Sequence, residues 1–397
     1  MAEAAITSQR RIGAGRILLV ALAAIVSACS SVVPRSGPPV VQAPPPRVVA
    51  PAEPAVMPGL PTDEEHHMIA LLVPLTGTNG AVGRSLANAT QLALLDTGNA
   101  ALRITTYDTA TGPAAAAQKA IDEGARLILG PLLAEDVRAV LPVAKRAGVP
   151  VISFSNDATL AGSGAYLMGY SPAQSIARVV DYANSKGITS YGGLVAGGVY
   201  GQRASTVFLR AVEDNGGKVI GLQTYQHTPA AMAAAAARLG KSGPVGAVLV
   251  ADAGVGAAAI VPVMRRTGEA SARVLGVEFW NNDPSIGTRP ALNGAWFASV
   301  DNTLYRQYAA KYRARFGSGP YRLSSMGYDA VLLTIRIARD WRIGRPFPED
   351  RLRDKDGFAG IDGAFRFARD GVAERALAVQ EVRGGTTVTV SPAPSGF

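Results

Sequence analysis

The chain contains little of what most enzymes and metal sites require. Its 397 residues include one cysteine and three histidines, and aromatic residues make up only 6%. A single cysteine excludes an intramolecular disulfide, and no pair of cysteines or histidines has the spacing of a zinc site. No Gly-x-Ser-x-Gly turn and no phosphate-binding P-loop occurs. We therefore expect a non-catalytic protein without a metal or cofactor.

Long hydrophobic runs and dense charge are also missing. Beyond the N-terminal segment, no stretch reaches the roughly 18 apolar residues of a membrane span. The formal charge is +9, but charged residues make up only 17% and no run of five basic residues occurs. The composition therefore does not predict nucleic-acid binding, and it leaves open an unspecific attraction to anionic cell-wall polymers or lipids.

Residues 1–28 have the order of a secretory signal peptide. Three arginines precede an unbroken apolar run at residues 17–25, and small residues then lead to Cys29. This ending resembles the bacterial lipobox, whose cysteine is lipidated; the alternative is an ordinary signal peptide with a chance cysteine. Two or more acyl chains anchor a protein stably to a membrane. By resemblance to sorting signals, Ser30 favours the outer membrane, so we expect an envelope protein that faces the periplasm.

Proline dominates the next segment, residues 29–66. It contains PRSGPP, QAPPPRVVAPAEP and PGLP. Because proline blocks helices and strand ladders, this composition predicts an extended, semi-rigid tether between the anchor and the folded body. A proline-rich recognition motif is the alternative interpretation.

From Met68 onward, short apolar runs alternate with alanine-rich helical segments. The expected strands are Ile69–Pro74, Leu102–Tyr107, Arg126–Leu129, Val149–Ser153, Gly192–Ala196, Lys218–Thr224, Gly246–Ala251 and Arg273–Val277. The expected helices are Val82–Leu95, Pro113–Glu123, Glu135–Ala147, Ala173–Ser185, Gly201–Asn215, Pro229–Leu239 and Gly256–Thr267. This alternation predicts an α/β fold with parallel sheets covered by helices on both faces.

Two interruptions favour two sheets over the alternatives, a barrel or one large sheet. The glycine-containing segment 158–171 breaks the rhythm and adds a short strand at Tyr166–Gly169. Later, a lone strand at Trp296–Val300 precedes two consecutive helices, Asn302–Phe316 and Leu323–Trp341, which we expect to return to the first lobe.

The C-terminal part has a different pattern. Apolar residues alternate within Ala364–Val390 around a turn at Asp370-Gly371, which predicts antiparallel strands. The expected division is a first lobe of residues 67–171 and 299–343 and a second lobe of residues 172–298 and 344–397.

The order of several segments resembles the type I periplasmic binding fold in its leucine/isoleucine/valine-binding-protein branch. The segments are ALLVPLTGTNGAVGRSLANATQLAL, TTYDTATGPAAAAQKAIDEGARLILGPLLAEDVRAVLPVAKRAGVPVISFSND, VYGQRASTVFLRAVEDNGG and SSMGYDAVLLT. The resemblance covers nearly all of residues 68–345. It implies a two-lobed receptor that closes by hinge motion about crossings near Ser171 and Ser299.

A narrower resemblance involves shorter phrases. They are LILGPLL, PVISFSND, VEFWNNDP, GAWFASV and GAFRFARDGVAERALAVQEVRGG. Together they resemble the penicillin-binding-protein activators, outer-membrane lipoproteins thought to stimulate a peptidoglycan synthase. This resemblance implies a regulator of peptidoglycan synthesis, whereas the whole-fold resemblance also allows a substrate-binding lipoprotein of an ABC importer for amino acids, amides or short peptides. The expected partner is accordingly a peptidoglycan synthase (penicillin-binding protein) or an ABC permease.

Candidate ligand contacts follow from strand direction. Ligands of open α/β sheets bind beyond the carboxyl ends of the strands. The candidates at these ends are Thr78, Asp108, Ser153, Ser155, Asp157, Tyr200 and Glu278.

Amino-acid-binding members of the family clamp the ligand carboxylate with hydroxyls of the first lobe and the ammonium with a tyrosine and an acid of the second. By resemblance, Tyr200 and Glu278 match the second half. In the first half Ala134 has no hydroxyl, and Asp157 would repel a carboxylate, although Ser155 can donate. The resemblance therefore implies an eroded amino-acid clamp.

Structural roles compete with these assignments. Tyr200 could pack on its lobe, Asp108 could cap a strand end, and Trp280 could belong to the core. A Gly-x-Gly turn at Gly254 and Gly256, with Glu278 about twenty residues further on, imitates a dinucleotide fingerprint. We interpret this turn as a glycine-permitted helix start.

Overall fold

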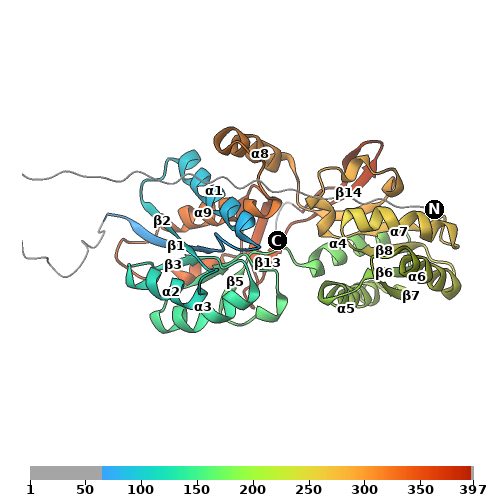
Figure 1. Cartoon of the computed structure of the whole chain (residues 1–397), viewed down its shortest axis with the longest axis horizontal. Helices are drawn as coiled ribbons and strands as arrows, with labels where there is room; N and C mark the ends of the chain where they lie inside the picture. Colours follow the sequence, from blue (N-terminus) through green and yellow to red (C-terminus); the bar gives the residue numbers. More distant parts are fainter. Residues whose placement is uncertain (1–64, 395–397) are drawn as a thin grey trace, which may run out of the picture. The chain divides into compact units, whose positions relative to one another are not determined.

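The computed structural model describes residues 65–394 (Figure 1). The expected signal peptide, Cys29 and nearly all of the tether lie outside these residues. Within them, no helix combines the length and the apolar character that crossing a membrane requires.

The first lobe is built on a five-stranded parallel sheet in the order β2-β1-β3-β4-β5. Its strands are β1 (His67–Val73), β2 (Leu102–Asp108), β3 (Leu127–Leu129), β4 (Val151–Ser153) and β5 (Ala165–Leu167). The connecting helices are α1 (Gly80–Thr97), α2 (Pro113–Asp122) and α3 (Ala134–Ala147). The predicted parallel sheet is confirmed.

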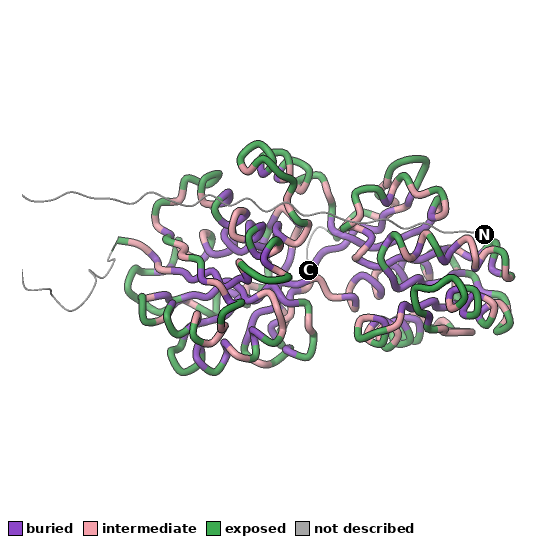
Figure 2. The backbone as a smooth tube through the Cα atoms, in the orientation of Figure 1, coloured by how far each residue is buried: buried purple, intermediate pink, exposed green. Residues whose placement is uncertain are grey.

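Alternation along β1 shows how this sheet is covered on both faces. Ile69 and Leu71 pack with apolar residues of α1, whereas Ala70 and Leu72 pack in a separate cluster with residues of α2 and α3. Successive strand residues point to opposite faces, so a strand buried on both sides must be continuously apolar, as this one is. Figure 2 shows the buried strands inside exposed helices.

The second lobe contains a seven-stranded mixed sheet in the order β15-β14-β10-β9-β8-β6-β7. Its strands are β6 (Ser190–Ala196), β7 (Lys218–Tyr225), β8 (Ala247–Ala251), β9 (Arg273–Gly276), β10 (Trp296–Ser299), β14 (Ala378–Arg383) and β15 (Thr386–Ser391). Its helices are α4 (Pro172–Ser185), α5 (Val199–Asp214), α6 (Pro229–Ser242) and α7 (Gly254–Arg266). The first five strands in chain order are parallel, and the terminal hairpin adds on antiparallel.

Two suspected structural roles are found in this lobe. Trp280 is fully buried, and its indole N–H donates to the Asp252 carbonyl at 3.0 Å. At the start of α7, a Cβ on Gly256 would lie 2.0 Å from the carboxylate of Asp252, the residue after β8, so the glycine permits this close approach.

The chain returns to the first lobe through α8 (Thr303–Phe316) and α9 (Ser325–Ala338). The expected helix Leu323–Trp341 is shorter at both ends, and the Trp341 ring stacks on His67 with centroids 4.0 Å apart. A three-stranded antiparallel sheet follows, made of β11 (Phe358–Gly360), β12 (Gly363–Phe367) and β13 (Ala373–Arg375). The predicted turn at Asp370-Gly371 joins its last two strands.

The assignment of residues 344–397 to the second lobe needs correction. Phe358, Phe365 and Phe367 pack in the first-lobe cluster that also contains Ile69. The small sheet has an apolar face, and α9, which contacts β11, supplies the surface that buries it. Only the segment from Leu377 onward packs in the second-lobe core.

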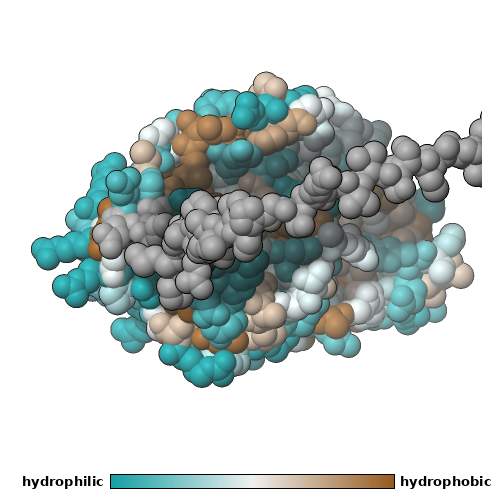
Figure 3. All heavy atoms as spheres, turned by 60° about the vertical axis from the view of Figure 1, so that its left-hand side comes forward, coloured by the Kyte–Doolittle hydropathy of each residue, from teal (hydrophilic) through white to brown (hydrophobic). Residues whose placement is uncertain are grey.

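The chain therefore crosses between the lobes three times. It crosses at Tyr170-Ser171 after β5, at Val300 after β10, and at Ala376-Leu377 before β14. The first two lie where hinge crossings were expected, whereas the expected division placed the third between residues 343 and 344. In the view of Figure 3, hydrophilic surface predominates over the described residues and hydrophobic side chains form separate areas.

Candidate functional site

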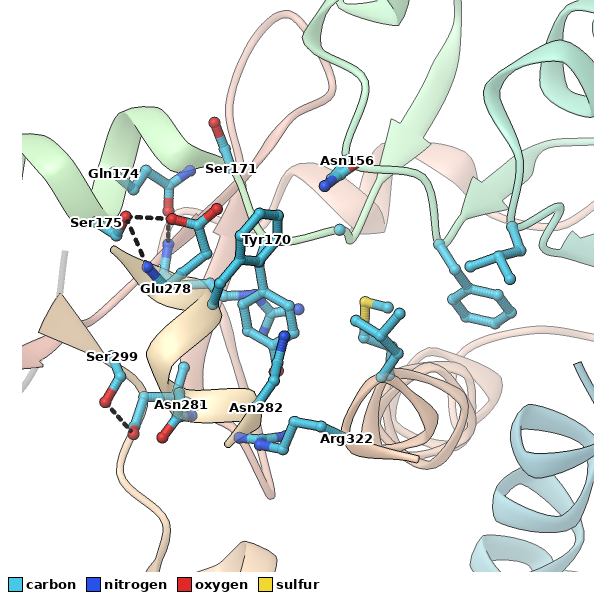
Figure 4. Close-up of a pocket in the computed structure, with 18 of the residues that line it drawn as sticks. Asn156, Tyr170, Ser171, Gln174, Ser175, Glu278, Asn281, Asn282, Ser299 and Arg322 are labelled. Atoms are coloured by element: carbon cyan, nitrogen blue, oxygen red, sulfur yellow. Dashed lines mark hydrogen bonds between the residues drawn. The ribbon is translucent and has the colours of Figure 1, made fainter. Parts of the chain in front are cut away.

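A cavity of about 270 Å³ lies where the three crossings meet the carboxyl ends of the strands (Figure 4). Elements of both lobes line it. The lining residues are Asn79, Val82, Leu132, Leu133, Phe154, Asn156, Gly169, Tyr170, Ser171, Gln174, Ser175, Glu278, Phe279, Asn281, Asn282, Ser299, Val300, Arg322, Leu323, Met326, Arg375 and Leu377.

The lining is divided by chemistry. The first lobe contributes most of the apolar wall, through Val82, Leu132, Leu133, Phe154, Leu323 and Met326. The second lobe and the crossings contribute most of the polar groups, and Figure 4 shows Gln174, Ser175 and Glu278 gathered on one side. Such a cavity suits a small molecule with an apolar body and a polar head.

Glu278 is the central acid of the polar side and is only 8% exposed. The Ser175 hydroxyl donates to its Oε2 at 2.6 Å, and the Tyr200 hydroxyl donates to its Oε1 at 3.0 Å. Burial raises the pKa of Glu278, and these hydrogen bonds offset only part of that rise. Burial, and then the neighbouring Glu278, raise the pKa of Tyr200, so its phenol stays protonated and donates.

Two buried arginines complete the polar side. Arg322 precedes α9 and pairs with Asp362 at 2.8 Å; both side chains are at least nine-tenths buried. The Tyr170 hydroxyl also donates to Asp362, and the Ser325 hydroxyl does so at 2.5 Å. Burial alone would raise the pKa of Asp362, but Arg322 outweighs it and lowers the pKa, so this carboxylate is ionised.

Arg375, at the end of β13, is held without an ion pair among the described residues. Its Nη2 donates to the Met168 carbonyl at 2.8 Å, and its backbone N–H donates to the Gln174 side chain at 2.9 Å. Its guanidinium lies 4.7 Å from the Tyr170 ring centroid and 5.2 Å from that of Phe365. Its Nε and Nη1 are buried and have no hydrogen-bond acceptor in the described part of the chain.

Of the seven residues expected to contact a ligand, Glu278 lines the cavity. Tyr200 lies behind it, with its ring stacked on Phe279 at 4.3 Å. Thr78 is exposed and outside the lining. Asp108 accepts from the backbone of Leu75 at 2.8 Å and so ties down the loop after β1.

The loop after β4 uses its hydroxyls internally. Ser153 donates to the Pro131 carbonyl and accepts from the Ser155 backbone, and Ser155 accepts from the Asp157 backbone at 3.2 Å. Asp157 forms ion pairs with Arg138 at 3.1 Å and with Arg203 at 2.8 Å. Arg203 belongs to α5 of the second lobe, so this second ion pair joins the two lobes.

Several lining residues were missed by the sequence reasoning. Asn156, Asn281 and Asn282 lie in loops whose position at strand ends was recognised, although their side chains were not singled out. Gln174 begins the helix after the first crossing and Arg375 ends a strand expected in the other lobe. No sequence pattern marked either residue.

A model of the family described as periplasmic binding protein matches residues 68–386. The chain belongs to the periplasmic binding protein family. The family points to the periplasm or cell envelope as the place of action, and its members are substrate-binding proteins.

Solved structures of this family share the fold. A Rhodospirillum rubrum protein described as a candidate branched-chain amino acid ABC transporter is 20% identical, with a TM-score of 0.73 over 82% of this chain and 100% of that one. LivJ of Streptococcus pneumoniae, in complex with isoleucine, is 17% identical, with a TM-score of 0.59 over 82% and 100%. A Rhodopseudomonas palustris solute-binding protein in complex with benzoate is 17% identical, with a TM-score of 0.60 over 83% and 97%.

A curated relative adds no activity. It is an uncharacterized protein of Rickettsia prowazekii, 24% identical over 166 residues. The match covers 41% of this chain and less than half, 44%, of that relative's length.

Proposed function

We propose that the protein is a non-catalytic receptor of the cell envelope that binds a small solute between its two lobes. The observation that carries this proposal is the cavity at the three crossings, which is lined from both lobes and contains buried charged groups. Cavities with an apolar wall and a few polar groups are the usual form of small-molecule sites. An ABC permease is the partner that the transport relatives suggest for such a receptor.

The proposal includes a lipid anchor at Cys29 and a tether over residues 29–66, based on the resemblance to a lipobox. The proposal also divides the body into lobes of residues 67–171 and 301–376, and of residues 172–300 and 377–394, and it is supported by the core in which each segment packs. Ligand binding should then be coupled to lobe closure, because both lobes contribute to the cavity.

The test is a thermal-shift screen of the mature chain against amino acids, amides, organic acids and short peptides. A ligand present at 100 times its dissociation constant should stabilise the fold by about 2.7 kcal/mol. Asn156→Trp, at the cavity lining, should abolish the shift, whereas Thr78→Trp, on the exposed loop outside the lining, should preserve it. A flat screen across all four classes would argue against a receptor.

A second candidate is a regulator of a peptidoglycan synthase, as the penicillin-binding-protein activator resemblance implies. One structural observation favours it: the loop that would hold an amino-acid carboxylate uses Asp157 for ion pairs instead. An outer-membrane anchor, suggested by Ser30, would also separate the protein from an inner-membrane permease. Purified synthase should then form more cross-linked product when this protein is added, and an unchanged rate with no complex in a pull-down would exclude the role.

A further inference from the structure

A second groove, of about 480 Å³, lies between helix α8 of the first lobe and the surface of the second lobe. It adjoins the cavity at the crossings, and Arg322 lines both. The first-lobe wall consists of Tyr305, Arg306, Ala309 and Arg313, whose spacing along α8 places them on one flank of the helix. Both of these arginines on α8 are exposed, so a molecule in the groove can contact them directly.

The two arginines on α8 form no ion pair with an acid of residues 65–394. Asp283, which also lines the groove, pairs with Arg289 at 2.7 Å. Asp301 accepts from the backbone N–H of Thr303 at 2.6 Å, and it attracts Arg306 without an ion-pair contact. Helix α8 itself contains four basic residues and no acid. The groove therefore has a net positive charge on its first-lobe side.

The opposite wall offers neutral hydrogen-bonding groups. Asn282 and Thr386 are exposed, Thr387 is half-buried, and all three line the groove. The largest purely apolar side chains of the lining, Ile286 and Phe297, are only 6% and 1% exposed, so they present little surface to a ligand. Amide and hydroxyl groups complement the hydroxyls of a sugar, because these groups both donate and accept hydrogen bonds.

We infer that this groove binds an acidic glycan, whose carboxylates are held by Arg306 and Arg313. The sugar hydroxyls lie against Asn282 and Thr387 on the second lobe. Seven residues separate the two arginines, which places them about 10 Å apart along the helix. This spacing suits two anionic groups along one chain better than a single small anion, and guanidinium groups bind carboxylates through paired hydrogen bonds.

The glycan site is distinct from the proposed solute site. An acidic peptide would share the charge of the glycan, but its apolar side chains would find few exposed apolar partners on the second-lobe wall. The acidic glycan is therefore the class that both walls favour, and an acidic peptide is the competing outcome of the test.

The test is titration calorimetry of the mature chain with trigalacturonate and with its methyl ester, a neutral trisaccharide of similar shape. The acid should bind about tenfold more tightly than the ester, because the ester cannot pair with the guanidinium groups. The affinity for the acid should fall as salt is raised, since the arginines are exposed. Asn156→Trp, which obstructs the solute cavity, should bind trigalacturonate as the wild type does.

Variants locate the carboxylates. The double variant Arg306→Gln with Arg313→Gln should weaken the acid about tenfold and change binding of the ester little. The matched control is Lys311→Gln with Arg315→Gln, which removes the same charge from exposed positions of the same helix outside the lining, and it should bind the acid as wild type. Thr387→Trp should weaken both trisaccharides because it fills the groove from the second lobe.

Four results would overturn the inference. An equal loss in both double variants would show a general attraction to basic charge rather than a site. Equal affinity for the acid and its ester would show that the arginines hold no carboxylate, and an equally tight pentaglutamate peptide would exclude a glycan-specific site. Loss of trigalacturonate binding in Asn156→Trp would place the trisaccharide in the solute cavity. The solute receptor is tested separately, because the thermal-shift screen uses solutes of the other cavity.

Discussion

The ion pair between Asp157 and Arg203 predicts how firmly the two lobes are held together. Asp157 lies in the first lobe and Arg203 on α5 of the second, with 2.8 Å between Oδ1 and Nη2. Asp157 also pairs with Arg138, which belongs to its own lobe. Arg203→Gln therefore removes an ionic contact between the lobes, and Arg138→Gln removes one within a lobe.

The expected size of the effect follows from exposure. The side chains are 36% exposed for Arg203 and 13% for Asp157, so solvent screens the pair and its contribution is about 0.5–1 kcal/mol. Losing it should raise the ratio of open to closed molecules roughly 2–5-fold in the absence of ligand. If the closed form binds, ligand affinity should fall by at most this factor, because the apparent dissociation constant rises as the closed fraction falls.

Fluorescence energy transfer between the lobes measures this ratio. Cys29 is the only cysteine of the chain, so a Cys29→Ser background allows specific labelling at Gln118→Cys on α2 and Lys241→Cys on α6, both exposed. Transfer should decrease in Arg203→Gln, stay at the wild-type value in Arg138→Gln, and decrease in wild type at high salt. Equal transfer in both variants, or no salt effect in wild type, would refute the view that the Asp157–Arg203 ion pair holds the lobes together.

Three further predictions concern stability. Tyr200→Phe removes the hydroxyl that donates to buried Glu278, and it should lower the free energy of unfolding, measured by urea titration, by about 1–2 kcal/mol. A loss below about 0.5 kcal/mol would show that this hydrogen bond contributes little to stability. Gly276→Ala would place a Cβ 2.4 Å from the Trp280 ring. It should lower the free energy of unfolding by about 1–3 kcal/mol, which a thermal melt would show as a lower melting temperature. Burial, and then Asp362, raise the pKa of Asp329, so the carboxyl proton is held more tightly in the native state than in the unfolded state. The free energy of unfolding should therefore fall as the pH rises from about 4 to 7, and Asp329→Asn should flatten this slope.

The layered fold could be predicted because its signal is repeated along the chain. Each central strand is continuously apolar and each connecting helix is amphipathic, so strands and helices are recognised without knowledge of their neighbours. The lobe in which a strand is buried could not be predicted from such local patterns. Phe365 and Phe367 alternate as in any half-buried strand, and only tertiary contacts determine that they are buried in the first lobe, where the ring of Phe367 packs against Tyr166 of β5.

The site was predicted at the level of loops rather than side chains. Strand direction placed the loops of Asp157 and Glu278 at the edge of the sheets where the cavity lies. Within the loop after β4, however, the Ser153 and Ser155 hydroxyls satisfy backbone groups, while Asn156 lines the cavity. Loops have no periodicity from which side-chain direction can be deduced, so the polar residue types alone were a poor guide.

The ion pairs of Asp157 bear on what the loop after β4 can bind. In an amino-acid clamp, the loop after β4 must stay free to receive a carboxylate, and an aspartate there would repel it. Here Asp157 is paired with two arginines, one from each lobe, so the loop is committed to holding the lobes together.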